Sequence, residues 1–191
     1  MIMNAEGLGI LALGNADRAA AIAAINAYLR IEHGAEDTLI AGLGETALGL
    51  AEQFIGAVLV VRTITITLPV VAGWQRLPVA PVRSITGVSA LASDGSVAAL
   101  PLADYAVDIA ADGTGWVRLI DAGGARAVQV ACTAGVAGDW ASLAPPIRQG
   151  VVLLAGYLFR ERDATGTTPA EVAALWRPFR RLALAEMGPG A

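Results

Sequence analysis

A strongly periodic apolar segment, residues 145–184, places the tightest limit on how this chain can fold. The segment opens with Pro145 and Pro146, which a helix tolerates best in its first turn. Apolar residues then recur at spacings of four, three and four, with a second apolar line beside the first: Ile147, Val151, Leu154 and Leu158, then Val152, Gly156 and Phe159. A helix that is apolar over so much of its circumference is buried from more than one side. Because the apolar run 151–159 is shorter than the roughly 20 residues of a membrane span, the pattern predicts a core helix.

A second helix is predicted shortly after the first, beyond a turn at residues 164–167. The sequence Thr168-Pro169-Ala170-Glu171 fits a capping box, with Thr168 as the N-cap and Glu171 reaching back to it. Pro178 removes a backbone donor, so we expect it to end or kink this helix before the chain continues through residues 179–182.

Two further helices are predicted near the N-terminus. Apolar residues at helical spacing indicate one helix from Asn15 or Asp17, either of which could cap it, to about residue 30. After a turn at residues 32–35, a second helix is expected over residues 36–55. We expect one of its faces to be apolar and another to carry Glu45 and Glu52; the apolar face is Leu39, Leu43, Ala47, Leu50 and Phe54. Three glycines inside this helix, at positions 42, 44 and 49, suggest either very close packing or a helix that is firm only once assembled.

At residue 56 the apolar period changes from that of a helix to that of a strand. Strands are predicted over residues 60–68, 74–77, 83–91, 105–109, 116–120 and 126–133, separated by Asp- and Gly-rich turns. Short strands joined by tight turns indicate an antiparallel sheet. The sequence therefore predicts an α+β fold, a bundle of about four helices with an inserted antiparallel β-rich region, as a single domain over residues 1–191. Its parts are a helical pair (15–56), the β-rich insertion (57–140), and C-terminal helices with a tail (145–187).

Composition indicates that some apolar surface belongs in an interface. Hydrophobic residues make up 55% of the chain and charged residues only 16%, which is little charge for a soluble monomer. The net charge of −4 argues against a general phosphate-binding surface. No basic region precedes the N-terminal apolar residues, so we expect no signal peptide and a cytosolic chain until it joins a partner.

Residues that could carry chemistry are few. His33, the sole histidine, falls in a polar turn, and Cys132, the sole cysteine, falls in a strand pattern typical of a core residue. Asp104 and Asp108 would lie on one face of a strand about 13 Å apart. Other patterns are weak as functional signals: glycine patterns at 7–12 and 42–47 that imitate a nucleotide fingerprint, and the turn aspartates Asp112 and Asp121. We predict no catalytic residue, metal or cofactor; a small-molecule-binding or hydrolytic domain using His33 or the Asp104/Asp108 pair is the rival from another class.

One cluster combines aromatic and basic residues near the C-terminus: Trp176, Arg177, Phe179, Arg180 and Arg181. It can be a solvated helix end, where arginine is favourable, or a protein-docking site, because tryptophan and arginine dominate interface hot spots. DNA binding is a third interpretation.

The ordered segments resemble the tailed-phage head-tail connector family, also called head-completion adaptors, over residues 15–182. The matching segments are 28–31, 36–40, 51–56, 77–85, 104–108, 145–149, 157–162 and 169–180. No single motif among them is diagnostic, so the resemblance rests on their order. The chain departs from the family in having no lysine and many glycines in its predicted helices. No particular salt bridge of the family can therefore be assigned to it.

This resemblance implies a structural, non-enzymatic role. It implies a homo-oligomeric ring of twelve copies in the neck of a phage, prophage-derived or gene transfer agent particle, assembled in the bacterial cytoplasm. The ring would bind the capsid portal on one side and a stopper or tail protein on the other, with DNA as passing cargo and no membrane partner. It further implies portal docking by Trp176, Arg177, Phe179, Arg180 and Arg181. The alternative is a stopper or tail-terminator ring that contacts the tail rather than the portal.

Overall fold

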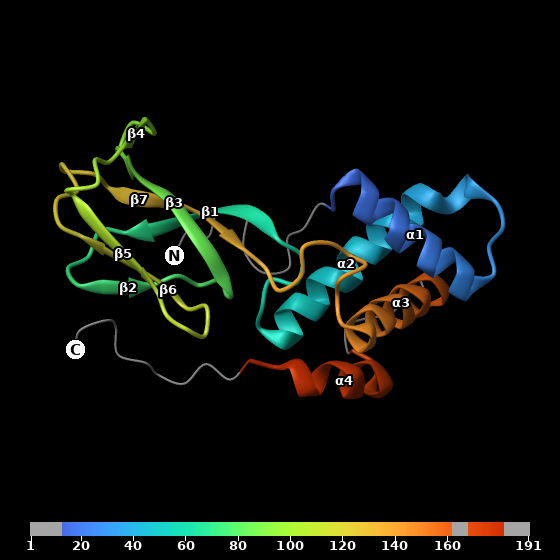
Figure 1. Ribbon diagram of the computed structural model, residues 1–191. Helices are drawn as coiled ribbons and strands as arrows, with labels where there is room; N and C mark the ends of the chain where they lie inside the picture. The colour runs from blue at the N-terminus through green and yellow to red at the C-terminus, as the bar shows by residue number, and fades with distance from the viewer. Residues whose placement is uncertain (1–12, 162–167, 182–191) are drawn as a thin grey trace. The chain divides into compact units, whose positions relative to one another are not determined.

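The chain contains two compact units, one helical and one rich in β-structure (Figure 1). The computed structural model describes residues 13–161 and 168–181. Within these, residues 13–60 and 137–181 form the helical unit and residues 61–136 form the β-rich unit. The predicted α+β class is confirmed.

The N-terminal helical pair of the helical unit consists of α1 (Asn15–Leu29) and α2 (Asp37–Ile55), with a 3₁₀ turn (Gly34–Glu36) between them. Both helices match the prediction, but neither predicted cap is used. Gly14 occupies the N-cap position of α1. The Asp17 carboxylate instead accepts a hydrogen bond of 2.8 Å from the Trp140 backbone N–H, so it ties α1 to the chain that enters the third helix.

The C-terminal helices are α3 (Pro145–Arg160) and α4 (Ala170–Trp176). As predicted, α3 begins at the proline pair, and α4 ends before Pro178, where a 3₁₀ turn (Arg177–Phe179) follows. The predicted capping box is wrong: Pro169 is the N-cap residue of α4, and no side chain caps it. Pro169 has extended geometry, with ψ of 143°, so the helix begins only at Ala170. The predicted turn at 164–167 and the tail at 182–187 lie outside the described residues.

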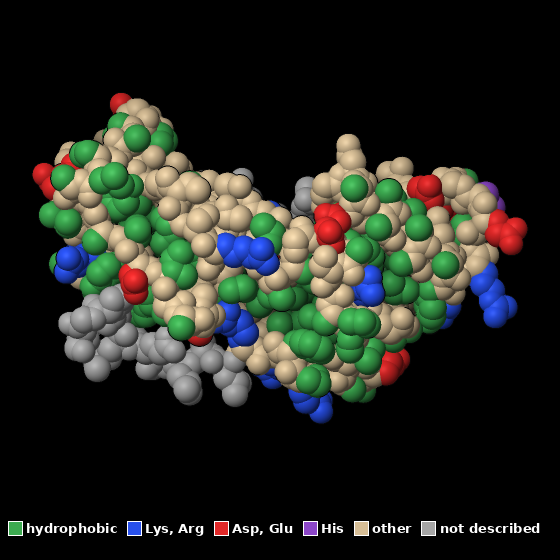
Figure 2. All heavy atoms as spheres, viewed as in Figure 1, with side chains coloured by type: hydrophobic (Ala, Val, Ile, Leu, Met, Phe, Trp, Pro, Cys, Tyr) green, Lys and Arg blue, Asp and Glu red, His purple; other side chains and the backbone are tan. Residues whose placement is uncertain are grey.

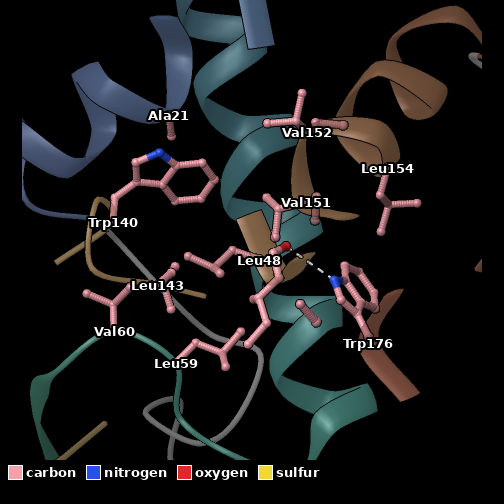
Figure 3. Packing of buried hydrophobic residues seen from close by; sticks show 14 of the residues in the cluster. Ala21, Leu48, Leu59, Val60, Trp140, Leu143, Val151, Val152, Leu154 and Trp176 are labelled. Atoms are coloured by element: carbon pink, nitrogen blue, oxygen red, sulfur yellow. Dashed lines mark hydrogen bonds between the residues drawn. The ribbon is translucent and has the colours of Figure 1, made fainter. Parts of the chain in front are cut away.

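One apolar core joins the four helices (Figure 3). Leu48 and Val151 lie near its centre, with Trp140 at one side and Trp176 at the other. The inward face of α2 consists of Ile40, Ala47, Leu48, Ala51 and Ile55. The predicted inward face of α2 was therefore partly wrong, because Leu39 and Leu50 are 50% and 36% exposed.

Glu52 organises the point where α2 ends. It was predicted on a polar face but is fully buried. Its carboxylate accepts a hydrogen bond of 2.8 Å from the Leu59 N–H, and its carbonyl accepts from the N–H groups of Gly56 and Ala57. Gly56 adopts the left-handed conformation, with φ of 76°, that commonly ends a helix. Glu52 therefore fixes the path of residues 56–59 as the chain leaves the helix.

Seven strands form the β-rich unit (Figure 1). They are β1 (Arg62–Pro69), β2 (Trp74–Arg76), β3 (Val82–Leu91), β4 (Val97–Ala99), β5 (Tyr105–Ile109), β6 (Gly115–Leu119) and β7 (Ala127–Ala134). One sheet has the order β1-β7-β3-β4 and the other the order β2-β6-β5. Every pair of these strands is antiparallel, as predicted. The short exposed strand β4 was not predicted.

Strand β7 carries much of the core of this unit. Its alternate residues Val128, Val130, Cys132 and Ala134 are fully buried. In register with them lie Ile64 and Ile66 of β1, which pair with Cys132 and Val130. This two-residue alternation of burial is the pattern that the sequence predicted.

Candidate functional site

The predicted docking cluster lies on the last described segment of the helical unit, residues 176–181. This segment begins with the last residue of α4 and is held against the C-terminal end of α2. The Arg181 backbone N–H donates a 2.8 Å hydrogen bond to the carbonyl of Ile55, which is one of the α2 carbonyls that lack a partner within the helix. The segment therefore has a fixed place on the helical unit.

Trp176 is a core residue and not a surface anchor. Its side chain is fully buried, and its indole N–H donates a 3.2 Å hydrogen bond to the carbonyl of Ile147 in the first turn of α3 (Figure 3). The indole fits against Gly150, where an added Cβ would lie 2.7 Å from Trp176 Cε2. The Trp176 side chain therefore anchors this segment internally, and direct docking by it stays a prediction.

The other members of the cluster reach the surface. Arg177 and Arg180 are exposed, whereas Phe179 and Arg181 are half-buried. The Arg180 guanidinium carbon lies 5.4 Å from the centroid of the Phe54 ring, and that ring lies 5.8 Å from the ring of Trp176. A cation over an aromatic face is held by the ring quadrupole, so Arg180 is positioned by the core beneath it.

Arg180 and Arg181 also lie near the C-terminal end of α2, whose last carbonyls carry partial negative charge. Cations are favourable in such a position. Sequence had suggested that arginine lies at the end of its own helix. Arg177 does occupy the C-cap position of α4, and Arg180 and Arg181 lie at the end of α2. The resulting surface, with Arg177 and Arg180 outermost, is suited to an anionic or carboxylate-bearing partner.

The residues considered for catalysis lie on different elements of the chain. His33 is exposed and precedes the 3₁₀ turn between α1 and α2. Asp108 is exposed on β5, and Asp104 precedes that strand, where its carbonyl accepts from the N–H groups of Ile120 and Asp121. Within residues 13–161 and 168–181, no group of three or more His, Cys, Asp or Glu side chains could hold a metal ion.

Cys132 and the turn aspartates have local structural roles. Burial raises the pKa of the Cys132 thiol to about 11, which leaves it protonated and a poor nucleophile at neutral pH. Asp112 accepts from the backbone and hydroxyl of Thr114 at 2.8 and 2.7 Å, and Asp121 accepts from the Gly123 N–H at 2.8 Å. Of the two glycine patterns, that at 42–47 lies inside α2, and that at 7–12 lies outside the described residues.

A small groove on the helical unit was missed by the sequence interpretation. It has a volume of about 190 Å³ and lies between α1, α3 and α4; its lining includes Tyr28, Leu153, Tyr157, Arg160, Pro169 and Val172. Gly156 makes room for one wall, since a Cβ there would lie 2.5 Å from Tyr28 Cε1. The available signal was the wide apolar circumference of α3, which exceeds what one neighbouring helix can cover.

Similarity to known proteins lies in the fold. No protein-family model matches the sequence, and no curated protein matches it significantly. Among solved structures, a chain from the neck of an empty gene transfer agent (GTA) particle, computed with C6 symmetry, matches with a TM-score of 0.71. The identity is 22%, and the match covers 99% of this chain and 100% of that one. The chain has the fold of a GTA neck chain.

Two further structures support the same fold. A chain from the neck of a native GTA particle, computed with C12 symmetry, matches with a TM-score of 0.70 at 20% identity, over 99% of this chain and 100% of that chain. A chain from the virion of a native GTA particle matches with a TM-score of 0.67 at 23% identity, over 96% and 97%. Because the likeness spans both units, the fold resemblance is not limited to one common motif. In the part of the chain that the structure describes, no helix is long and apolar enough to cross a membrane.

Proposed function

We propose that this protein is a structural adaptor in the neck of a phage or phage-like particle. It forms a ring between the capsid portal and the stopper or tail, and DNA passes through the central channel. The ring assembles in the bacterial cytoplasm and works without a catalytic site or cofactor. The observation that carries this proposal is the full-length fold match to chains from GTA necks.

The surface chemistry supports a subunit of a larger assembly. Apolar residues such as Leu39, Leu102 and Ile120 are 50%, 82% and 61% exposed. A subunit that buries much of its surface against neighbours can carry such residues, because they leave water on assembly. The fold-matched necks were computed with C6 or C12 symmetry, which supports a cyclic ring of twelve copies for this chain.

The net charge supports a channel through which DNA slides. The chain carries −4 overall. A basic lumen would bind the phosphate backbone and release counterions, which would hold the DNA in place. A chain with net negative charge avoids this contact with the phosphate backbone, so the DNA can pass through the channel.

For portal docking we propose the basic surface formed by the exposed Arg177 and Arg180 with the half-buried Phe179 and Arg181. Trp176 supports this surface from inside the core. The residues are well placed because the Ile55 carbonyl and the Phe54 ring hold the segment, so little order has to be gained on binding.

The test is to mix the purified protein with the portal protein of its own particle and follow co-sedimentation. Binding to the portal supports the adaptor function. Binding to tail components without binding to the portal would replace it with a stopper or tail-terminator function. Binding to neither would overturn the proposal.

A further inference from the structure

The outer face of α2 has an unusual composition for an exposed helix. Its exposed residues are Thr38, Leu39, Gly42, Thr46, Leu50 and Gln53, which lie on one side of the helix at 3.6 residues per turn. None of these is charged. The structure describes every residue of α2, and its three acids lie elsewhere: Asp37 in the first turn, Glu45 paired with Arg18 at 2.7 Å, and Glu52 in the core.

This face indicates a second burial surface on the same helix. The inward face of α2 already fills the core of the helical unit, yet Leu39 and Leu50 point outward. A helix with apolar residues on both sides favours an arrangement in which both sides are covered. Figure 2 shows the helical unit with broad uncharged areas between single charged side chains.

The groove between α1, α3 and α4 has complementary properties. Its two tyrosines, Tyr28 and Tyr157, are 36% and 39% exposed, and the Arg160 guanidinium carbon lies 5.3 Å from the Tyr28 ring centroid. Tyrosine and arginine are enriched at interface centres. At about 190 Å³ the groove is smaller than the roughly 300–1,000 Å³ of small-molecule sites, so it suits protruding side chains of a neighbouring helix.

The two surfaces lie on opposite sides of one unit. Helices α1, α2 and α3 all contact one another, and the groove is formed by α1 and α3 with α4. The outer face of α2 points away from both α1 and α3. A protein with complementary surfaces on opposite sides associates head to tail, and such contacts close into a ring when the rotation between copies permits.

We propose that the outer face of α2 on one copy packs into the tyrosine groove of the next copy and forms the subunit contact of the ring. This inference deepens the proposed function and rests on it for the ring. The occupant is a second copy rather than nucleic acid, because the α2 face offers no cation to phosphate, and the charged residues that line the groove, Arg160, Glu161 and Glu171, are of mixed sign. Small residues at Gly42 and Thr46 allow the neighbouring helix to approach closely.

The test uses disulfide cross-linking of the full chain. The substitutions Leu50→Cys and Tyr157→Cys are introduced together, Cys132 stays in place because it is buried, and the protein is oxidised at high concentration. A head-to-tail contact produces a ladder of cross-linked multimers from the double variant. A mixture of the two single variants produces dimers only, and neither single variant alone produces any.

Matched variants distinguish cross-linking through a specific contact from cross-linking through random collision. Adding Gly42→Arg to the double variant abolishes the ladder, because the long side chain keeps the outer face of α2 from approaching the groove closely. Adding Ala23→Arg, an exposed α1 position outside both surfaces, leaves the ladder intact. Both arginines leave the melting temperature close to that of the parent or higher, since Gly42 has nothing within 4 Å of an added Cβ.

Three outcomes overturn the inference: no ladder from the double variant, a ladder that survives Gly42→Arg, or dimers from Leu50→Cys alone. The last would show an α2-to-α2 contact with two-fold symmetry. The experiment contains no portal protein, so failure of portal binding leaves its result unaffected. A ladder without portal binding would retain this contact and reject the adaptor function.

Discussion

Replacing Gly150 with alanine destabilises the helical unit, although alanine is the better helix former. Gly150 lies inside α3, and its missing side chain leaves room for the indole of Trp176. The new methyl would lie 2.7 Å from Cε2 and 3.0 Å from Cδ1 of that ring. Because Trp176 is fully buried and its N–H is bonded to Ile147, the ring cannot swing into solvent to make room.

The expected change in the free energy of unfolding of Gly150→Ala is the sum of three contributions. Overpacking a core costs about 1–3 kcal/mol, and loss of the indole hydrogen bond costs about 1 kcal/mol. The helix preference for alanine over glycine returns about 1 kcal/mol. The free energy of unfolding should therefore fall by about 1–3 kcal/mol, measured by urea denaturation with helix content followed by circular dichroism.

Gly42→Ala is the matched control. This glycine also lies inside a helix, but nothing lies within 4 Å of an added Cβ. Only the propensity difference then acts, and stability should rise by about 0.5–1 kcal/mol. Changing Trp176 to Phe in the Gly150→Ala background should recover part of the loss, because the smaller ring vacates space. If Gly150→Ala proves as stable as the parent, Trp176 does not occupy this slot and could again be a surface anchor.

Three further predictions concern the docking surface, the end of α2 and the buried thiol. The double substitution Arg177→Glu with Arg180→Glu should weaken portal binding at least about tenfold and lower the melting temperature only slightly, since the cation over Phe54 is lost, whereas Arg126→Glu on the β-rich unit should leave binding unchanged; equal effects in a binding titration would reject the docking surface. Glu52→Ala should lower the free energy of unfolding by about 1–3 kcal/mol, because the Leu59 N–H loses its acceptor. Glu52→Gln, which keeps an acceptor, should lower it less. Equal losses for the two variants in urea denaturation would show that this hydrogen bond does not stabilise the fold. Cys132 should resist thiol reagents in the folded protein at neutral pH. Since its pKa rises from 9.0 to about 11 on folding, its contribution to stability is full below pH 9 and is lost as the pH rises toward 11. Rapid labelling of the native protein, or the same alkaline decline in Cys132→Ala, would contradict this.

Hydrophobic periodicity predicted the elements well where one period was clear. The proline pair fixed the start of α3, and the alternation around Ile64 and Val130 located β1 and β7. Strand β4 was missed because its three residues are all exposed and show no alternation. Its position depends on pairing with β3, which is a tertiary contact.

The orientation of α2 could not be chosen from periodicity. Leucine, isoleucine and alanine occur all around this helix, so several faces were equally apolar in sequence. The structure turns Ile40 and Leu48 inward and leaves Leu39 and Leu50 outside. The same ambiguity affected the docking cluster. Tryptophan beside arginine is common both at interfaces and at the edge of a core, and the deciding partner, Gly150, is 26 residues away in sequence.

The central claim is that this protein forms an adaptor ring on a portal. The most direct measurement is electron microscopy of the purified protein mixed with its portal, with the rotational symmetry of any added density determined from images along the channel axis. The account predicts a ring of twelve copies stacked on the portal and an open channel through both. Portal particles without added density, imaged under conditions in which the protein instead caps tail tubes, would contradict it.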